Sequence, residues 1–282
     1  MKVSIIIPAK NESQALPKLL DQLHAEWPNA EVIIVDDGSD DETQGICVEK
    51  GVKVIRHPYS KGNGAAIKSG ARVAEGDILV FMDADGQHRP KDVSLLLDKI
   101  FEGYDMAIGA RSREAQASFG RAWANGFYNR LATSMVGHDV MDLTSGFRAV
   151  KRELFLKYLY MLPNGFSYPT TITMAFFRAG YSVAYIPVSV ERRVGKSHIK
   201  LFRDGTKFLL IIFKIGSLYS PLKIFFPVSV AAFSMGIFHY IYVYATRSQF
   251  SNMSELLFLS SLVIFLLGLV SEQVTILLYR EK

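Results

Sequence analysis

The sequence predicts an α/β domain with a mainly parallel sheet, followed by a pair of membrane-spanning helices. Three observations indicate this fold class. Short β-branched apolar runs alternate with longer stretches over residues 3–110. Polar residues collect directly after several of these runs. Two long apolar stretches lie near the C-terminus. With 282 residues, the chain is long enough for one large core and such an appendage.

The predicted strands are apolar runs rich in Val and Ile. They are VSIIIPA (3–9), EVIIVDD (31–37), VKVIRH (52–57), DILVFMDAD (77–85) and DMAIGA (105–110). Most of the stretches between them are typical of helices, and this alternation predicts βαβ units. The ligand crevice of such a fold lies at the carboxyl ends of its strands. Polar clusters stand at three of those ends, at Pro8–Glu12, Asp36–Ser39 and Asp83–Gln87.

The net charge of +5 is concentrated in one short stretch. Residues 1–191 carry 21 Lys and Arg against 23 Asp and Glu, whereas residues 192–223 carry 8 against the single Asp204. This basic run lies directly before the most apolar part of the chain, which favours anionic lipid headgroups over nucleic acid as its partner. A lone cysteine, Cys47, excludes an intramolecular disulfide and any multi-cysteine metal site.

The two apolar stretches can each cross a lipid bilayer. Ile224–Ala245 lacks acids, Lys and Arg, and Leu256–Tyr279 is interrupted only by Glu272. About 20 apolar residues in a helix cross a hydrocarbon core of about 30 Å. The connection TRSQFSNMSE is short, so the pair predicts a helical hairpin. Glu272 marks either a functional or inter-helix contact or a solvated position near the cytosolic end. A buried hairpin inside a soluble protein is the alternative.

Basic residues flank the outer ends of this hairpin and include Arg280 and Lys282, so the positive-inside rule places the N-terminal domain in the cytosol. Just before the hairpin, Lys200, Arg203, Lys207 and Lys214 fall on one helical face with Leu, Ile and Phe opposite. Such an amphipathic helix lies in the membrane interface or, alternatively, packs on the domain. The expected organisation is a cytosolic domain at 1–198, a juxtamembrane helix at 199–220 and a transmembrane hairpin at 221–282.

Asp83-Ala84-Asp85-Gly86-Gln87-His88 is the strongest motif. Its two carboxylates follow a buried strand, and Gly86 supplies the turn that brings both to one side. Carboxylates in this arrangement suit Mg²⁺ or Mn²⁺, with Gln87 or water as a further ligand. The alternative is capping of the next helix, where Pro90 stands at an expected first position.

Two other clusters predict contacts with a nucleotide. Asp37 is expected to bind the ligand, whereas Ser39 and Asp40 are expected to cap the following helix. Lys61-Gly62-Asn63-Gly64-Ala65-Ala66 opens a predicted helix, and its glycines would let backbone N–H groups approach an anion with Lys61 nearby. The chain has no GxxxxGK[ST] loop, no G-x-G-x-x-G after the first strand, no G-x-S-x-G and no H-E-x-x-H.

Taken in order, these clusters together with Pro8-Ala9-Lys10-Asn11-Glu12 resemble family-2 glycosyltransferases. Leu143-Thr144-Ser145-Gly146-Phe147-Arg148 and Arg192-Arg193-Val194-Gly195-Lys196-Ser197 resemble the polyprenyl-phosphate branch of that family. The resemblance spans residues 2 to about 200 and implies an A-type, Rossmann-like glycosyltransferase domain. It also implies inverting transfer of a hexosyl group, from a donor of the GDP-mannose or UDP-glucose type, to a polyprenyl or dolichyl phosphate.

The resemblance also implies roles for individual residues. Asp85 and Gln87, with Asp83 directly or through water, would hold the metal, and Arg192 and His198 would meet phosphates from a closing loop. His198 stands where many relatives have Lys, so Lys196 or Lys200 is the alternative. The implied nucleotide and diphosphate contacts are Pro8, Lys10, Glu12, Val35, Asp37, Asp83, Ala84 and Asp85.

No acid is present in residues 164–171, the stretch where many hydroxyl-directed relatives place a catalytic acidic pair. A phosphate acceptor needs no such base, because it is already an anion near neutral pH. The expected phosphate ligands are Arg111, Arg121 and Arg148, since Arg binds phosphate through two donors at once. Asp142 is either a residual base or a group that orients an arginine.

Three other functions compete with this reading. A polymerising membrane glycan synthase would need more than two spans or a partner to enclose a channel, and the chain has no Q-x-x-R-W motif. An inert membrane scaffold would keep the fold without the chemistry. A nucleic-acid-binding protein would need the basic run to be free in solution. Self-association through the hairpins, giving a homo-oligomer, is compatible with the preferred reading.

Overall fold

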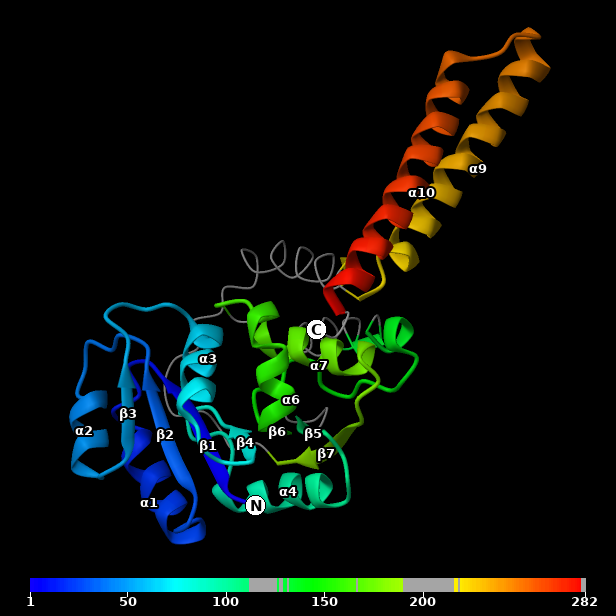
Figure 1. The fold of residues 1–282 in the computed structure, drawn as a ribbon. Helices are drawn as coiled ribbons and strands as arrows, with labels where there is room; N and C mark the ends of the chain where they lie inside the picture. The colour runs from blue at the N-terminus through cyan, green and yellow to red at the C-terminus, as the bar shows by residue number, and fades with distance from the viewer. Residues whose placement is uncertain are drawn as a thin grey trace. The chain divides into compact units, whose positions relative to one another are not determined.

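The computed structural model describes residues 1–111, 126, 129–130, 132–165, 167–189, 216–217 and 219–279. The chain divides into two compact units, Met1–Lys200 and Leu201–Lys282. In its described parts the first unit is a layered α/β domain, and the second contains a hairpin of two long helices (Figure 1).

The first unit is built on a seven-stranded sheet with the strand order β3-β2-β1-β4-β6-β5-β7. Its strands are β1 (Val3–Ala9), β2 (Glu31–Asp36), β3 (Lys53–Arg56), β4 (Ile78–Phe81), β5 (Met106–Arg111), β6 (Arg148–Lys151) and β7 (Val183–Val188). All neighbouring pairs are parallel except those of β6, which runs antiparallel to both β4 and β5. The predicted α/β class with a mainly parallel sheet is confirmed.

Helices cover both faces of the sheet (Figure 1). The helices are α1 (Leu16–Glu26), α2 (Thr43–Glu49), α3 (Asn63–Val73), α4 (Val93–Phe101), α6 (Arg152–Lys157) and α7 (Tyr168–Arg178), with the short 3-10 turns η1 (Pro90–Asp92) and η3 (Leu159–Met161). On one face, α1, α2 and α4 bury apolar residues such as Leu20 and Leu96 against Ile5 and Val80 of the sheet.

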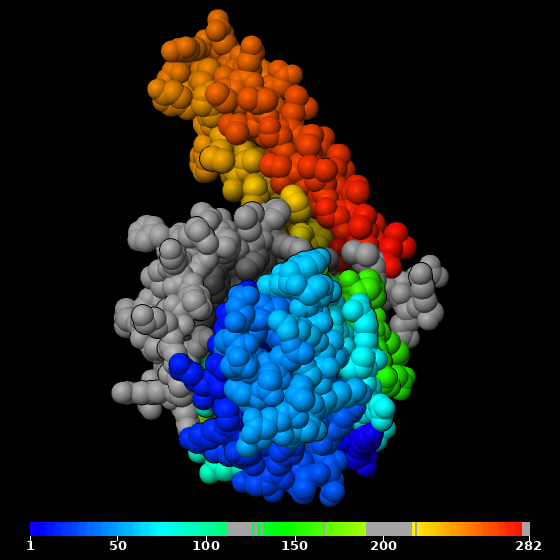
Figure 2. Space-filling view, turned by 90° about the vertical axis from the view of Figure 1, so that its left-hand side faces the viewer, coloured from blue at the N-terminus to red at the C-terminus, as the bar shows by residue number. Residues whose placement is uncertain are grey.

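The other face carries α3, α6 and α7. Helix α3 lies very close to the sheet at Gly70, where an added Cβ would come within 2.4 Å of Ile6 Cγ2. Phe81 of β4 packs against Phe155 of α6, with ring centroids 4.8 Å apart and the rings tilted by 40°. Viewed from the side of α2, the blue to cyan atoms of the N-terminal part of this unit form a continuous surface (Figure 2). The sheet is therefore buried on both faces, as its uninterrupted apolar strands require.

The hairpin consists of α9 (Pro221–Arg247) and α10 (Asn252–Tyr279). Both helices are long and apolar enough to cross a membrane, with mean hydropathy values of 1.7 and 2.3. Most of their large apolar side chains are exposed, as lipid-facing residues of a hairpin would be. The connection is shorter than the predicted ten residues, because the helices end at Arg247 and restart at Asn252. A left-handed Ser248, with φ of +48°, makes the turn.

The two helices meet along a seam of small and polar residues. On α10 the buried positions Ser254, Ser261, Gly268 and Thr275 recur every seven residues. Ser229 Oγ of α9 donates a 2.9 Å hydrogen bond to the Ser261 carbonyl oxygen. A spacing of seven keeps one face of each helix on its partner.

Glu272 lies on α10 and contacts the start of α9. Its Oε2 accepts hydrogen bonds from Ser220 Oγ at 3.4 Å and from the Leu222 N–H at 3.3 Å. A carboxylate at this place satisfies a free N–H group of the first turn of α9 and complements the dipole of that helix. Of the two readings of Glu272, the structure supports the contact between helices.

Candidate functional site

The carboxylates of the Asp83–His88 motif follow β4 directly. Asp85 is only 8% exposed, and Ala84 between the two acids is buried. Gly86 adopts a left-handed φ of +72°, and the Gln87 N–H donates a 3.2 Å hydrogen bond to Asp85 Oδ1. The predicted turn at Gly86 is therefore present. It folds the motif back on itself at the carboxyl end of the strand.

A segment distant in sequence meets this motif. Because β6 is antiparallel, its first residue Arg148 pairs with Phe81, the last residue of β4. The preceding loop passes the acids so closely that a Cβ on Gly146 would lie 3.0 Å from Asp83 Oδ2. The structure thus brings the motif at 83–88 and the motif at 143–148 into one site.

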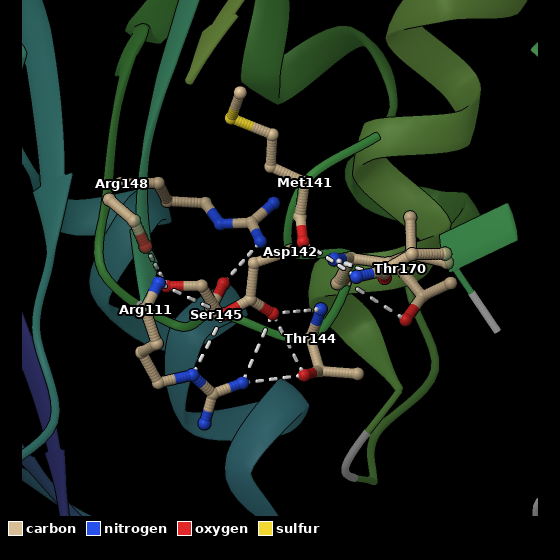
Figure 3. Close-up of polar contacts among 10 residues, drawn as sticks. Arg111, Met141, Asp142, Thr144, Ser145, Arg148 and Thr170 are labelled. Atoms are coloured by element: carbon tan, nitrogen blue, oxygen red, sulfur yellow. Dashed lines mark hydrogen bonds and ion pairs between the residues drawn. The ribbon is translucent and has the colours of Figure 1, made fainter. Parts of the chain in front are cut away.

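Arg111, at the end of β5, is held in this site by two partners (Figure 3). Its Nε and Nη2 donate to the two carboxylate oxygens of Asp142 at 2.7 and 3.1 Å, and Nη2 also donates to Thr144 Oγ1 at 2.7 Å. The Arg111 side chain remains 31% exposed. A fixed guanidinium with an accessible side suits recognition of an anion.

Charge reinforces this arrangement. Burial alone would lower the pKa of Arg111, but the hydrogen bond and charge of Asp142, with further contributions from Asp83 and Asp85, raise it above its ordinary value. Burial would raise the pKa of Asp142, but Arg111 and Thr144 lower it below its ordinary value. The contacts of Asp142 with Arg111 and its lowered pKa favour the arginine-orienting alternative over the residual base.

His88 is a member of the site that the motif alone did not assign. It is buried, and its ring stacks on Phe147 with centroids 4.7 Å apart. Burial lowers the pKa of His88 to about 4, so the imidazole is neutral near pH 7. The stack joins the two motifs through their last aromatic residues. A signal was present in the sequence, because both rings belong to the motifs themselves.

The structure places Arg148 in the core and not at the surface of the site. It is fully buried, and its guanidinium donates to the Pro169 carbonyl oxygen at 3.0 Å, to Thr173 Oγ1 at 3.1 Å and to the Ser145 carbonyl oxygen. The expected contact of Arg148 with an acceptor phosphate does not fit this position. Its donors instead tie α7 to the loop before β6.

Asp37 accepts four hydrogen bonds from its own chain. The donors are His57 Nδ1 at 2.7 Å, and Ser60 Oγ and the N–H groups of Lys61 and Gly62, each at 2.8 Å. A carboxylate has about four acceptor positions, so these donors occupy Asp37. The expected nucleotide contact of Asp37 is thus not open in this conformation. Asp37 shapes the loop before α3 instead.

Hydrogen bonds join the turns that follow the neighbouring strands β1 and β2. The Asn11 N–H donates to Ser39 Oγ at 2.9 Å, and the Asp40 N–H donates to Asn11 Oδ1 at 2.9 Å. Ser39 and Asp40 do not cap α2 as expected, because that helix begins later, at Thr43, without a side-chain cap. The sequence pattern gave the wrong start for this helix.

The remaining nucleotide candidates lie around the same turns. Lys10 is exposed, and Pro8 and Glu12 are partly buried at the end of β1 and the turn after it. Val35 is fully buried, and its side chain lies near Gly70 of α3, so it belongs to the core. Arg121, Arg192 and His198 lie outside the described residues, as does most of the expected juxtamembrane helix.

The loop at Lys61 does not offer the expected anion cradle. The N–H groups of Gly64 and Ala65, at the start of α3, donate to the carbonyl oxygens of Gly165 at 3.2 Å and Asn164 at 3.0 Å. The donors that were expected to meet a phosphate are thus used within the chain. Lys61 lies over the Tyr59 ring at 5.7 Å.

A hard divalent cation fits the donor set at the end of β4. The described residues contain no group of three or more His, Cys, Asp and Glu side chains arranged for a metal. They do contain Asp83 and Asp85 with Gln87, and the charges of both acids stabilise the protonated form of Arg111. Mg²⁺ and Mn²⁺ are commonly held by one or two carboxylates while phosphate and water complete the shell.

Comparison with known proteins gives the same picture. Residues 4–159 match the family described as Glycosyl transferase family 2, and residues 220–277 match the GtrB C-terminal hairpin. The polyprenol monophosphomannose synthase of Mycolicibacterium smegmatis is 30% identical over 75% of this chain and 84% of its own. The undecaprenyl-phosphate 4-deoxy-4-formamido-L-arabinose transferase of Proteus mirabilis is 34% identical over 54% of this chain and 50% of its own.

Among solved structures, glucosyl-3-phosphoglycerate synthase from Mycobacterium tuberculosis, in complex with Mn²⁺, UDP and glucosyl-3-phosphoglycerate, matches with a TM-score of 0.62. It is 23% identical, and the match covers 77% of this chain and 79% of the other. The predicted A-type glycosyltransferase fold is confirmed by this likeness. From the extent of the family match, this chain belongs to glycosyl transferase family 2.

Proposed function

We propose that this protein transfers a hexosyl group from a nucleoside diphosphate sugar to the phosphate of a polyprenyl lipid, with inversion at the anomeric carbon. The observation that carries this proposal is the placement of Arg111. Asp142 and Thr144 fix its guanidinium beside Asp83 and Asp85, and part of the side chain stays exposed. A cation for one phosphate thus lies next to acids suited to a metal-bound diphosphate.

The first turn of α7 supports a phosphate acceptor. It contains no acid, and the side chains of Tyr168 and Thr170 are buried there. An alcohol acceptor would need a general base, whereas a phosphate monoester is already anionic and can attack directly. What remains for the protein is to hold two anions in line, which is a task of positioning.

The relatives support the same acceptor class. The names of the M. smegmatis and P. mirabilis proteins both specify a polyprenyl acceptor, although the sugars differ. The donor proposed here is of the GDP-mannose or UDP-glucose type. The acceptor phosphate binds Arg111, with Arg121, Arg192 and His198 as further candidate ligands of phosphate groups. The nucleotide lies against the turns that carry Lys10 and Glu12.

Mg²⁺ or Mn²⁺ would be held by Asp83, Asp85 and Gln87. When bound, the ion supplies positive charge that neutralises the departing nucleoside diphosphate. His88 and Phe147, stacked on each other, keep that side of the site closely packed. The structural neighbour that holds Mn²⁺ together with UDP supports this assignment.

We further infer that residues 1–198 face the cytosol, that residues 199–220 lie in the interface and that residues 221–282 anchor the protein in the bilayer. The basic run before α9 supports this orientation. An acceptor dissolved in lipid explains the anchor, because enzyme and acceptor then meet within one membrane.

The test is a transfer assay with the full-length protein in lipid or detergent. Radiolabelled nucleotide sugars are offered with undecaprenyl or dolichyl phosphate and Mg²⁺ or Mn²⁺, and label extracted into organic solvent is counted. We expect one donor to label the lipid, chelation to stop transfer, and Asp85→Ala to abolish it while the protein stays folded and inserted. Transfer to a soluble alcohol but not to any lipid phosphate would refute the proposal. Full activity of Asp85→Ala would refute the metal site.

A further inference from the structure

The start of α3 holds a loop from the other half of the domain. The N–H groups of Gly64 and Ala65 donate to the carbonyl oxygens of Gly165 and Asn164. Lys68, one turn further along α3, donates through Nζ to the Leu162 carbonyl oxygen at 3.1 Å and to Asn164 Oδ1. Residues 162–165 thus act as the cap that the first turn of α3 would otherwise lack.

The two glycines of this turn are required by the contact. A Cβ on Gly64 would lie 2.1 Å from the Pro163 carbonyl oxygen, which is far inside van der Waals contact. A Cβ on Gly62 would lie 2.6 Å from the Asn164 carbonyl oxygen, and Gly62 also has a left-handed φ of +101°. Backbone packs on backbone here, so no flexible side chain can move aside to make room.

The docked loop leads into the acceptor half of the site, by which we mean Arg111, the 142–146 loop and the first turn of α7. Helix α7 begins at Tyr168, three residues after Gly165. Thr170 Oγ1 in its first turn donates to the Leu143 carbonyl oxygen at 3.3 Å. Arg148 donates to the Pro169 carbonyl oxygen. The loop that contains Gly146 and passes Asp83 is therefore tied to the first turn of α7.

On its other side the docking point is held by Asp37, the residue that follows β2. Asp37 accepts the N–H groups of Lys61 and Gly62, and it is itself in contact with the buried His57. A continuous set of contacts thus runs from the end of β2, through the start of α3, to the loop beside Asp83.

We propose that Gly62 and Gly64 are positioning residues for the acceptor half of the site. By holding residues 162–165, they set the first turn of α7 and the 142–146 loop, and through that loop the Asp142 that orients Arg111. The role in the acceptor half rests on the proposed function. The docking itself does not. This assigns the glycine-rich turn to loop docking in place of phosphate binding.

The test compares Gly64→Ala with Gly165→Ala in the full-length protein. Gly165 lies in the docked loop, and an added Cβ there meets nothing within 4 Å among the described residues, so it controls for a glycine-to-alanine change at the same contact. We expect Gly64→Ala to raise the KM for lipid phosphate about tenfold or more, because a shift of about 1 Å is enough to spoil positioning. The KM for the nucleotide sugar should change little. Gly165→Ala should resemble the wild type.

Lys68→Met provides a second variant that introduces no clash. It removes the hydrogen bonds to Leu162 and Asn164 and should raise the acceptor KM in the same direction, by less. It keeps the proposal testable if Gly64→Ala does not fold. Equal increases in the KM values for donor and acceptor, or wild-type values in both variants, would overturn the positioning role.

Amide hydrogen exchange separates this proposal from the proposed function, because it needs no substrate. Gly64→Ala should expose the amides of residues 167–171 and 143–146 to faster exchange, with Gly165→Ala unchanged. If the wild-type protein transfers no sugar to any lipid phosphate, the proposed function fails and the exchange result alone decides the docking. Identical exchange in the two variants would overturn the docking.

Discussion

Asp142 shows how one residue's surroundings decide between two chemical roles. Both carboxylate oxygens of Asp142 accept hydrogen bonds from Arg111, and the residue is only 4% exposed. Its pKa lies below the ordinary value, which makes it a poor base. Its contribution is to aim the guanidinium. The acceptor phosphate must then provide its own negative charge, which makes the pH dependence of transfer a direct test.

We expect the rate of transfer to rise with pH through about 6, the second pKa of a phosphate monoester, because the dianion is the stronger nucleophile. Asp142→Asn should lower kcat/KM for the acceptor by about a hundredfold through a misplaced Arg111. The same rise of kcat/KM with pH should persist in this variant. The measurement is kcat/KM against pH for both proteins. If kcat/KM of Asp142→Asn no longer rose with pH, Asp142 would instead be the base.

Glu31, at the opposite end of the sheet, serves stability. Burial alone would raise its pKa, but hydrogen bonds from the Glu75 N–H, Lys53 and Ser4 outweigh burial and lower the pKa to about 2. Since the folded-state pKa is depressed, the stabilisation is complete above the ordinary value of 4.5 and is lost as the pH falls through about 2.

We therefore expect Glu31→Gln to cost about 1–2 kcal/mol near neutral pH, the usual scale for a charge-assisted hydrogen-bond cluster. The difference from wild type should shrink between pH 4.5 and 2. Apparent melting temperatures measured in detergent across this range provide the test. Glu75→Gln is the control, because its ion pair with Lys2 is exposed. Equal effects of the two substitutions would contradict the assignment.

At the scale of elements, the hairpin depends on its seam more than on its hydrophobicity. In lipid, apolar side chains gain little by facing each other, so small residues and hydrogen bonds decide which faces meet. Ser229 and Ser261 lie across the seam with their Oγ atoms 3.2 Å apart. Their neighbour Leu262 is 54% exposed and is therefore not buried in the seam.

We expect the pair Ser229→Cys and Ser261→Cys to form a disulfide within one chain upon mild oxidation, because the two Oγ atoms are already in contact. Ser229→Cys with Leu262→Cys should not cross-link. The native Cys47 is buried and its pKa is raised by burial to about 11, so it should not interfere. Gel mobility after oxidation gives the measurement. Equal cross-linking of both pairs would contradict the seam.

Patterns along the chain predicted most of the elements but not all. The five apolar runs became β1 to β5, because buried parallel strands need continuous Val and Ile. Strand β6 was missed, since four residues with two charged ends carry no periodic signal. Strand β7 was missed as well, and Pro187 within it suits an edge strand and not a central one.

The site was predictable where a motif is local and not where partners are distant. The turn at Gly86 follows from adjacent residues. By contrast, the burial of Arg148 depends on Pro169 and Thr173, and the glycines near 62–64 depend on residues about a hundred positions away. Asp37 was assigned to the ligand because an acid after a buried strand suits a nucleotide contact. The donors that occupy it come from a loop whose path no sequence pattern reveals. Tertiary pairing decides such residues.

At the scale of the whole molecule, orientation in the membrane can be tested without activity. We expect Gln249→Cys, in the hairpin turn, to react in intact cells with a maleimide that cannot cross membranes. Glu49→Cys, on an exposed position of the first unit, should react only after the cells are made permeable. This follows from the excess of Lys and Arg at the outer ends of the hairpin. The reverse pattern would invert the proposed topology.

The single reversed strand has a consequence for how such an enzyme can change. Since β5 and β6 are antiparallel neighbours, the chain departs after Arg111 and re-enters at Arg148 on the same border of the sheet. The two ends of the segment between these residues are thus attached to neighbouring strands. Outside the residues that hold Arg111 and pass Asp83, this segment can therefore change in length without moving β5 or β6.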